Sequence, residues 1–170
     1  MRIPTFIVLA LVPLSTWADP GNSNIDYAGF THEVMEAAAV RESRRISEAD
    51  FVRMAHEPGT VVLDARTERL YDLRHIAGAR NIPFPEFTAE TLARVIPSRD
   101  TRVLIYCNNN FPSFPESMPT KAPAAALNVS TFVALRTYGY RNVYELRPLI
   151  DPRTTQLEFE GKELRRPSSS

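Results

Sequence analysis

The chain has 170 residues, in which 20 Lys and Arg balance 20 Asp and Glu, so its formal net charge is zero. Broad binding to nucleic acid or to an anionic membrane needs a basic field, which this balance does not supply. With 44% hydrophobic and 24% charged residues, the composition excludes a disordered chain and fits one globular domain. The single cysteine excludes an internal disulfide and a cysteine-rich zinc site.

Residues 1–18 have the features of a secretory signal peptide. Arg2 carries a positive charge, an apolar run follows, and the small residues Thr16 and Ala18 mark a cleavage site. We expect cleavage after Ala18 and export of the mature chain, into the periplasm if the source is Gram-negative. The alternative is a buried N-terminal helix or strand. The sequence has no apolar span of about 20 residues, so we expect no transmembrane segment in the mature chain.

Residues 19–44 are predicted to form an N-terminal helical arm that packs on the domain surface. Its apolar residues recur at helical spacing, and arginines gather near its end, where cations favour the helix dipole. The apolar positions are Tyr27, Phe30, Val34, Ala37 and Ala38.

Short apolar runs alternate with helical segments through residues 45–150. This alternation is typical of an α/β fold with a mostly parallel sheet, here of five strands flanked by helices. Ser47 and Thr88 fit helix N-caps, and Gly139 fits a helix terminator. The last helix is expected to begin at about Lys121 or Ala124 and to reach Tyr138. The expected strands lie at or near residues 46, 60–63, 80–82, 102–106 and 142–146.

Residues 151–170 are predicted to form a C-terminal extension and tail. Thr155, Leu157 and Phe159 alternate as in an edge strand. From Lys162 onward, we expect a disordered tail.

The single cysteine, Cys107, directly follows the strongest predicted strand, Arg102–Tyr106. Ligands of parallel sheets bind beyond the carboxyl ends of the strands, so this thiol occupies a position suited to chemistry. The alternative is that Cys107 is a small buried hydrophobic residue.

Four segments, taken in order, resemble the rhodanese-like domain of sulfurtransferases over roughly Arg45 to Leu146. They are Val61–Arg66, His75–Pro83, Val103–Cys107 and Tyr138–Leu146. The resemblance implies an enzyme in which the Cys107 thiolate takes a sulfane sulfur from thiosulfate or a persulfide. The Cys107 persulfide then passes this sulfur to a thiol or to cyanide. It also implies a structural role for Asp64, bonded to backbone N–H groups, and we expect a structural role for His75.

The segment after Cys107 departs from that family. Rhodanese loops usually carry an arginine a few residues after the cysteine, whereas the first basic residue here is Lys121. Related phosphatases and arsenate reductases need an arginine six positions after the cysteine. Ser113 stands there, so we do not expect phosphoryl chemistry. The loop 108–123 is long and holds four prolines. Its length predicts a helix that need not begin beside the thiol, which weakens the contribution of the helix dipole.

The candidate anion-binding groups are therefore polar or cationic side chains near Cys107 in sequence or at strand ends. No histidines and carboxylates have metal-ligand spacing, so we expect no metal and no other cofactor. The candidates are Asn108, Asn109, Asn110, Lys121 and Arg66, together with the backbone N–H groups after Cys107. The alternative for the asparagines is ordinary loop chemistry.

Two other functions remain open from the sequence. The loop 108–123 could recognise a protein partner, which would make the chain a non-catalytic rhodanese-like binding module. Alternatively, Cys107 could serve as a redox sensor, with a resolving cysteine supplied by another molecule. Phe111, Phe114 and Met118 would form a lid over the cysteine or, as we prefer, anchor the long loop.

Overall fold

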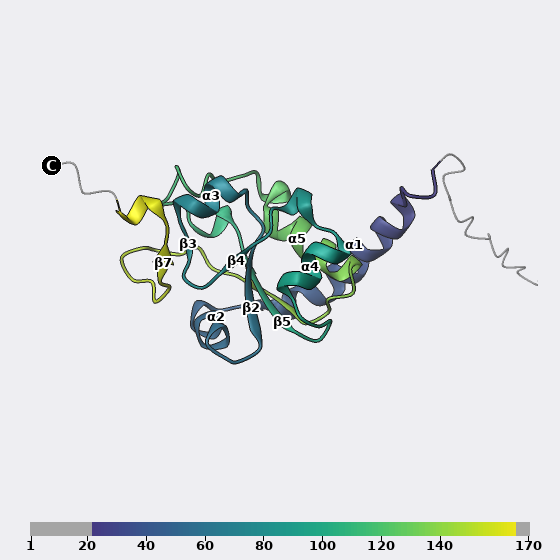
Figure 1. The fold of residues 1–170 in the computed structure, drawn as a ribbon, viewed down its shortest axis with the longest axis horizontal. Helices are drawn as coiled ribbons and strands as arrows, with labels where there is room; N and C mark the ends of the chain where they lie inside the picture. The colour runs from purple at the N-terminus through teal and green to yellow at the C-terminus, as the bar shows by residue number, and fades with distance from the viewer. Residues whose placement is uncertain (1–21, 166–170) are drawn as a thin grey trace, which may run out of the picture.

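The computed structural model describes residues 22–165. The predicted signal peptide, residues 1–18, lies outside this range. The centre of the molecule is a five-stranded sheet with the order β1-β6-β5-β2-β4, in which every pairing is parallel (Figure 1). The predicted α/β fold is confirmed. The strands are β1 (Arg45–Ile46), β2 (Thr60–Asp64), β4 (Arg80–Asn81), β5 (Arg102–Tyr106) and β6 (Val143–Leu146).

The register of the sheet brings three strand ends to one level. Asp64 at the end of β2 pairs with Asn81 of β4 on one side and with Tyr106 of β5 on the other. The central strands are short, apolar and almost wholly buried, as strands covered on both faces must be. Cys107 therefore leaves the sheet beside Asp64, at the carboxyl edge where ligands of such sheets bind.

Five α-helices lie within the described residues, and two begin at predicted caps. The side-chain oxygen of Ser47 accepts a hydrogen bond from the Asp50 N–H, and Thr88 forms a reciprocal capping box with Thr91. Gly139 follows the last helix with a φ of +87°, a left-handed conformation that suits glycine. The helices are α1 (Tyr27–Arg41), α2 (Glu48–Ala55), α3 (Glu68–Leu73), α4 (Ala89–Val95) and α5 (Leu127–Thr137).

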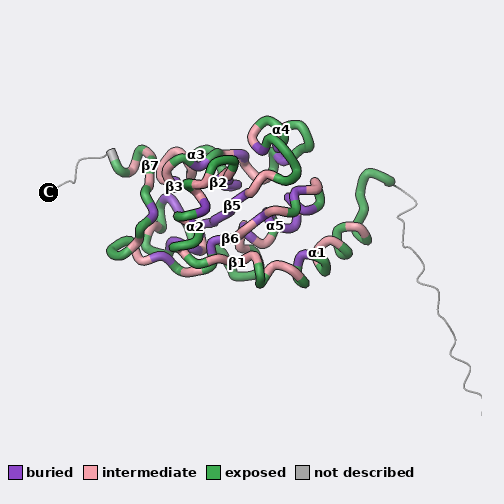
Figure 2. The backbone as a smooth tube through the Cα atoms, turned by 90° about the horizontal axis from the view of Figure 1, so that it is seen from below, coloured by how far each residue is buried: buried purple, intermediate pink, exposed green. Residues whose placement is uncertain are grey.

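The two faces of the sheet are covered differently. Helices α1, α4 and α5 bury one face, where Leu63, Val103 and Ile105 pack against Phe132. Helix α2, the segment after Cys107 and the C-terminal extension bury the other face, around Leu104. Figure 2 shows the buried residues concentrated along the central strands, with exposed residues outside.

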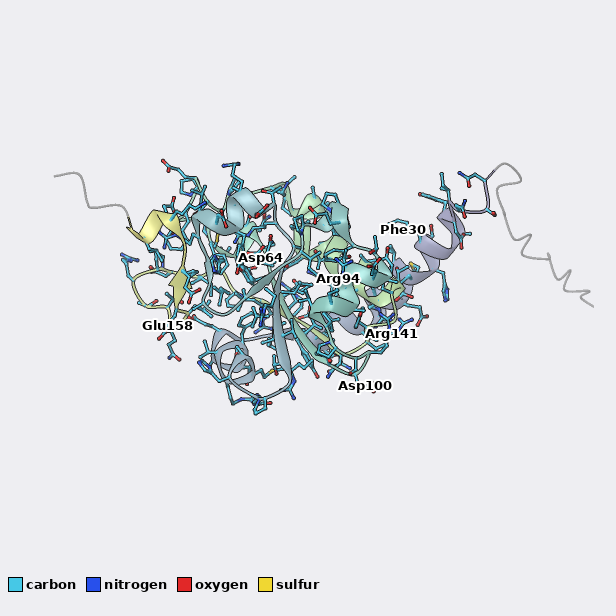
Figure 3. The ribbon with its side chains drawn as sticks, in the orientation of Figure 1. Phe30, Asp64, Arg94, Asp100, Arg141 and Glu158 are labelled. Carbon is cyan, nitrogen blue, oxygen red and sulfur yellow. The ribbon has the colours of Figure 1, made fainter. Side chains whose placement is uncertain are left out.

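Helix α1 lies within the predicted arm, residues 19–44, and packs through only part of its length. Its Glu33 accepts hydrogen bonds from Arg136 of α5 and from Arg141, at 2.9 and 2.7 Å, while Ala37 is buried. Its first turns project from the body of the molecule, with Phe30 exposed (Figures 1 and 3). Within residues 22–165, neither this helix nor any other has the length and apolarity that a membrane span requires.

The C-terminal extension folds back onto the domain. Strand β7 (Phe159–Glu160) pairs antiparallel with β3 (His75–Ile76) in a separate two-stranded sheet. Of the residues predicted as an edge strand, Thr155, Leu157 and Phe159, only Phe159 lies in β7. Residues Lys162–Arg165 form a 3₁₀ helix, where the sequence predicted a disordered tail. For residues 162–165 the prediction is wrong, because side chains far away in the sequence hold this segment, including Asp72, which pairs with Lys162 at 2.6 Å. Residues 166–170 of the predicted tail lie outside the described residues.

Candidate active site

Cys107 lies at the end of β5, and its side chain is almost fully buried, with the residue 2% exposed. It precedes a short 3₁₀ helix, Asn108–Asn110. The backbone N–H group of Asn110 caps its sulfur, and the backbone N–H groups of Asn109 and Asn128 lie close enough to lower the pKa of the thiol. Converging backbone N–H groups form a nest that favours an anion. The backbone donors predicted after Cys107 are therefore in place, and Asn128 is an addition to them.

The helix that follows the long loop does begin beside the thiol, contrary to the sequence expectation. Asn128 is the second residue of α5, whose first-turn N–H groups lack a side-chain cap. The helix starts later than predicted because Pro123–Ala125 forms a separate 3₁₀ turn before it. The orphan N–H groups of a helix start carry partial positive charge, so α5 supplies the dipole contribution that the loop length seemed to remove.

Asn109 closes the neck of the loop. Its side-chain amide donates to the backbone oxygen of Lys121 at 2.8 Å and accepts from the backbone N–H of Lys121 at 3.0 Å. These two hydrogen bonds span twelve residues and return the chain to the start of the turn. Loop length therefore has little influence on where α5 begins.

Asn110 ties the cysteine turn to the end of β6. Its Oδ1 accepts from the Cys107 N–H at 3.0 Å, and its Nδ2 donates to the carbonyls of Leu146 and Pro148 at 2.9 and 3.0 Å. The side-chain amides of Asn109 and Asn110 are thus occupied, which corrects the prediction that they bind the substrate anion. Asn108 differs, because neither polar atom of its buried amide has a hydrogen-bond partner among the described residues.

Arg66 is also corrected by the structure, since its guanidinium is not available to attract a substrate. The residue is 2% exposed and forms an ion pair with Asp64. Its remaining donors reach the backbone oxygens of Ser117 and Arg74 at 3.0 and 2.8 Å. This buried guanidinium holds the long loop and the segment after α3 to the carboxyl edge of the sheet.

Asp64 has the structural surroundings that the sequence predicted. It lies inside the molecule at the end of β2 (Figure 3). Its carboxylate accepts from the backbone N–H of Arg66 at 2.9 Å and from the hydroxyl of Tyr106 at 2.5 Å. Burial, reinforced by the Asp64 charge, raises the pKa of Tyr106 well above its ordinary value, so this hydroxyl stays a donor at neutral pH.

His75 and Lys121 lie in contrasting environments. The His75 ring stacks on Tyr71, its Nδ1 lies 2.7 Å from the Tyr71 carbonyl, and its Nε2 lies 3.4 Å from the Glu160 carboxylate. These contacts fit the predicted structural role. The side chain of Lys121 is exposed, and no hydrogen bond or ion pair joins its ammonium to another group in residues 22–165. Its part in anion binding stays a prediction.

The groups around Cys107 have opposing effects on the pKa of its thiol. Burial raises the pKa of the Cys107 thiol above its ordinary value, and the charge of Glu145 on β6 adds to this increase. The N–H groups of Asn128, Asn109 and Asn110 lower the pKa, but by less than burial raises it. The resting sulfur is therefore a protonated thiol at neutral pH, in a site that partly compensates the charge of an anion.

We expect alkylation of Cys107 by iodoacetamide to rise with pH to a midpoint above that of an ordinary thiol, about 8.5. The reason is that burial disfavours the charged thiolate, which is the reactive form. The measurement is the alkylation rate between pH 6 and about 10.5, corrected for reagent hydrolysis. The same chain unfolded in urea is the control, and a folded midpoint at or below the unfolded one contradicts this description.

Sequence reasoning missed two residues near the thiol. Asn128 carried no signal because its position depends on the folding of the long loop. Glu145 did carry one, since a carboxylate inside an apolar strand needs a cationic partner. That partner is Arg41 of α1, which meets Glu145 at 2.5 and 2.9 Å and thereby joins the helical arm to the strand beside Cys107.

The apolar residues of the long loop anchor it. Phe111 and Met118 are fully buried in the core on the α2 face of the sheet, and Phe114 packs against it partly buried. This agrees with the preferred sequence interpretation. It does not favour the binding-module alternative, because two of the loop's three large apolar side chains are not presented to a partner.

Comparison with known proteins agrees with this architecture. The family model described as a rhodanese-like domain matches residues 47–147, more than half of the chain. No curated protein gives a match. Among solved structures, the BH2092 protein from Bacillus halodurans is 25% identical with a TM-score of 0.51, over 78% of this chain and 88% of that one.

The rhodanese-like domain of the Alr3790 protein from Anabaena sp. is 18% identical with a TM-score of 0.52, over 75% of this chain and 86% of that one. This second likeness concerns the fold. It agrees with the family match and with the parallel sheet that carries Cys107 at its carboxyl edge. The chain therefore belongs to the family of rhodanese-like domains.

Proposed function

We propose that the protein is a sulfurtransferase in which Cys107 carries sulfane sulfur as a persulfide. The Cys107 thiolate attacks the outer sulfur of thiosulfate or of a persulfide donor. A bond forms between Sγ and that sulfur, while the donor's S–S bond breaks and sulfite, or the donor thiolate, leaves with the electron pair. A thiol or cyanide then attacks the outer sulfur of the Cys107 persulfide and regenerates the thiolate.

The observation that supports this proposal best is the ring of backbone donors at the sulfur. Three N–H groups from Asn109, Asn110 and Asn128 surround Sγ at the start of α5. Such donors stabilise the thiolate during attack and the persulfide anion afterwards, without any arginine side chain. The proposal thus explains how a rhodanese-like site can work although the loop after its cysteine has no arginine.

The remaining components belong to the same proposal. Asn108, whose buried amide has no partner among the described residues, is the side chain free to contact a bound donor. Lys121 supplies positive charge at the neck of the loop. The predicted signal peptide places the enzyme outside the cytoplasm, and a mature protein that begins at Asp19 would bear this out.

We expect purified protein to form thiocyanate from cyanide when thiosulfate or an alkyl persulfide is supplied. The rate should increase with pH over the range in which Cys107 ionises, since the attacking group is the thiolate. The measurement is the iron–thiocyanate absorbance, with protein-free reactions at each pH as the background. Failure of both donors at all pH values, with the protein folded, would exclude the proposed activity.

A further inference from the structure

The closure of the site around Cys107 involves the far end of the chain. We call residues 155–165 the C-terminal strap. Because Cys107 is 2% exposed, a sulfur donor can reach Sγ only after part of its surroundings moves. The segment that leaves the cysteine turn, residues 111–120, is held against the body of the protein by this strap. Figure 1 shows the strap beside β3 and α3, at the end of the molecule opposite the projecting arm.

The strap contacts the loop through an aromatic cluster around Phe159 and through the carboxylate of Glu163. The ring of Phe159 packs on the rings of Phe111 and Phe114, each with a centroid distance of 5.5 Å. The carboxylate of Glu163 accepts a hydrogen bond from the hydroxyl of Ser117 and another from Nε of Arg74, both at 2.9 Å. Two residues of the strap therefore hold three residues of the loop.

These contacts lead directly to the reactive residue. Phe111 is the first residue after the turn that holds Cys107, and its ring meets Tyr106 edge-on at a centroid distance of 5.9 Å. Tyr106 is the residue before Cys107. The ring of Phe111 contacts both Phe159 of the strap and Tyr106 beside the thiol. A displacement of Phe159 therefore removes a contact that holds the residues on either side of Cys107.

The two halves of the strap are held differently. Residues 155–158 are fixed by hydrogen bonds from Thr155 and Gln156 to Glu48 and by the buried side chain of Leu157, whereas residues 159–165 depend on a short strand and on side-chain contacts. Its strand pairs over two residues only, His75 with Glu160 and Ile76 with Phe159. Its outer ion pair, Lys162 with Asp72, is exposed, so solvent screens it and it contributes little to holding the strap. Short, edge-located pairings of this kind open locally at much lower free energy than the whole fold.

We propose that the C-terminal strap gates Cys107: its local detachment releases the loop at residues 111–120 and admits sulfur donors or acceptors to the thiol. The proposal names a regulation of the site assigned above, and in that sense it rests on the proposed function. The gate is a property of access, however, so it can be measured without any sulfur transfer.

Gly161 offers a specific way to open the strap. Its φ is +137°, and a Cβ built at this position would lie 2.2 Å from the carbonyl oxygen of Leu73. The backbone there cannot give way without moving the end of α3. Gly161→Ala therefore adds one methyl group that pushes the strap off the domain, without removing a charge or an aromatic ring.

Gly59, in the turn before β2, provides the matched control. It also has a positive φ, +78°, but a Cβ there meets nothing within 4 Å. Gly59→Ala places an alanine at positive φ with no steric displacement. If the reactivity of Cys107 rises in Gly161→Ala but not in Gly59→Ala, the displaced strap is the cause, and not the presence of an alanine at positive φ.

The experiment measures the rate at which Cys107 reacts with 5,5′-dithiobis(2-nitrobenzoate) in native buffer. Gly161→Ala and Phe159→Leu should each raise the rate at least about tenfold, because strain or lost packing at the strap shifts the local opening equilibrium. Gly59→Ala should react like the wild type. The rates should depend only weakly on low urea concentrations, since local opening exposes little surface.

Two results would overturn the gate. One is wild-type labelling rates in both strap variants, each shown to be folded by circular dichroism. The other is an equal rise in Gly59→Ala, or a steep urea dependence, which would assign the exposure to global unfolding. If Gly161→Ala does not fold, Phe159→Leu still decides. If the strap variants do not change the labelling rate but thiocyanate forms, the gate is wrong and the proposed function stands. If the labelling rate rises as expected but no thiocyanate forms, the proposed function is wrong and the gate stands.

Discussion

Cys107→Ser is expected to reduce sulfur transfer to the uncatalysed background, a loss of at least about a thousandfold. A serine hydroxyl does not ionise near neutral pH and cannot carry sulfane sulfur in place of a thiol. The three N–H groups around the side chain would then face a neutral oxygen. Thiocyanate formation under saturating donor is the measurement.

The fold should tolerate this change, which separates catalysis from stability. Serine is nearly the same shape as cysteine and can accept the same N–H groups, so the free energy of unfolding should stay within about 1 kcal/mol of the wild type. Urea denaturation checks this point. Substantial turnover by the folded serine variant would remove Cys107 from its assigned role and require another nucleophile.

Arg66→Met is expected to lower the free energy of unfolding by about 3–5 kcal/mol. The reason is that the fully buried carboxylate of Asp64 would lose its cationic partner. The carbonyls of Ser117 and Arg74 would lose their donors as well. Urea denaturation followed by circular dichroism measures the change.

Two further variants test the physical reason for that loss. Asp64→Asn combined with Arg66→Met removes the unpaired charge, so the double variant should be more stable than Arg66→Met alone. Arg69→Met, at an exposed position on α3, should alter stability by no more than about 0.5 kcal/mol. A loss below about 1 kcal/mol for Arg66→Met would show that the ion pair contributes little.

Much of the fold was predictable because its signals are local. The apolar run Arg102–Tyr106, the caps at Ser47 and Thr88 and the terminator Gly139 each act within a few residues, and all are found where expected. The place of Cys107 at a strand end followed from the same local pattern. Hydrophobic periodicity and capping depend only on residues that are close in sequence, so both can be recognised without knowing which distant residues are in contact.

The parts of the site that were not predicted depend on contacts between distant residues. Asn109 and Lys121 bring α5 back to the thiol across a loop of unusual length. Arg66 was expected to be available to substrate, and only the folded chain shows that it is enclosed with Asp64. The same limit applied to the strap, where the partner of Phe159 is Ile76, more than eighty residues earlier.

The most direct test of the proposed function is the intact mass of the protein after incubation with thiosulfate or an alkyl persulfide and removal of excess donor. We expect a gain of one sulfur atom, located on the peptide that contains Cys107 and lost when cyanide is added. Cys107→Ser should gain nothing. An unchanged mass of the folded wild-type protein with both donors, or an adduct that cyanide does not remove, would contradict sulfur transfer through Cys107.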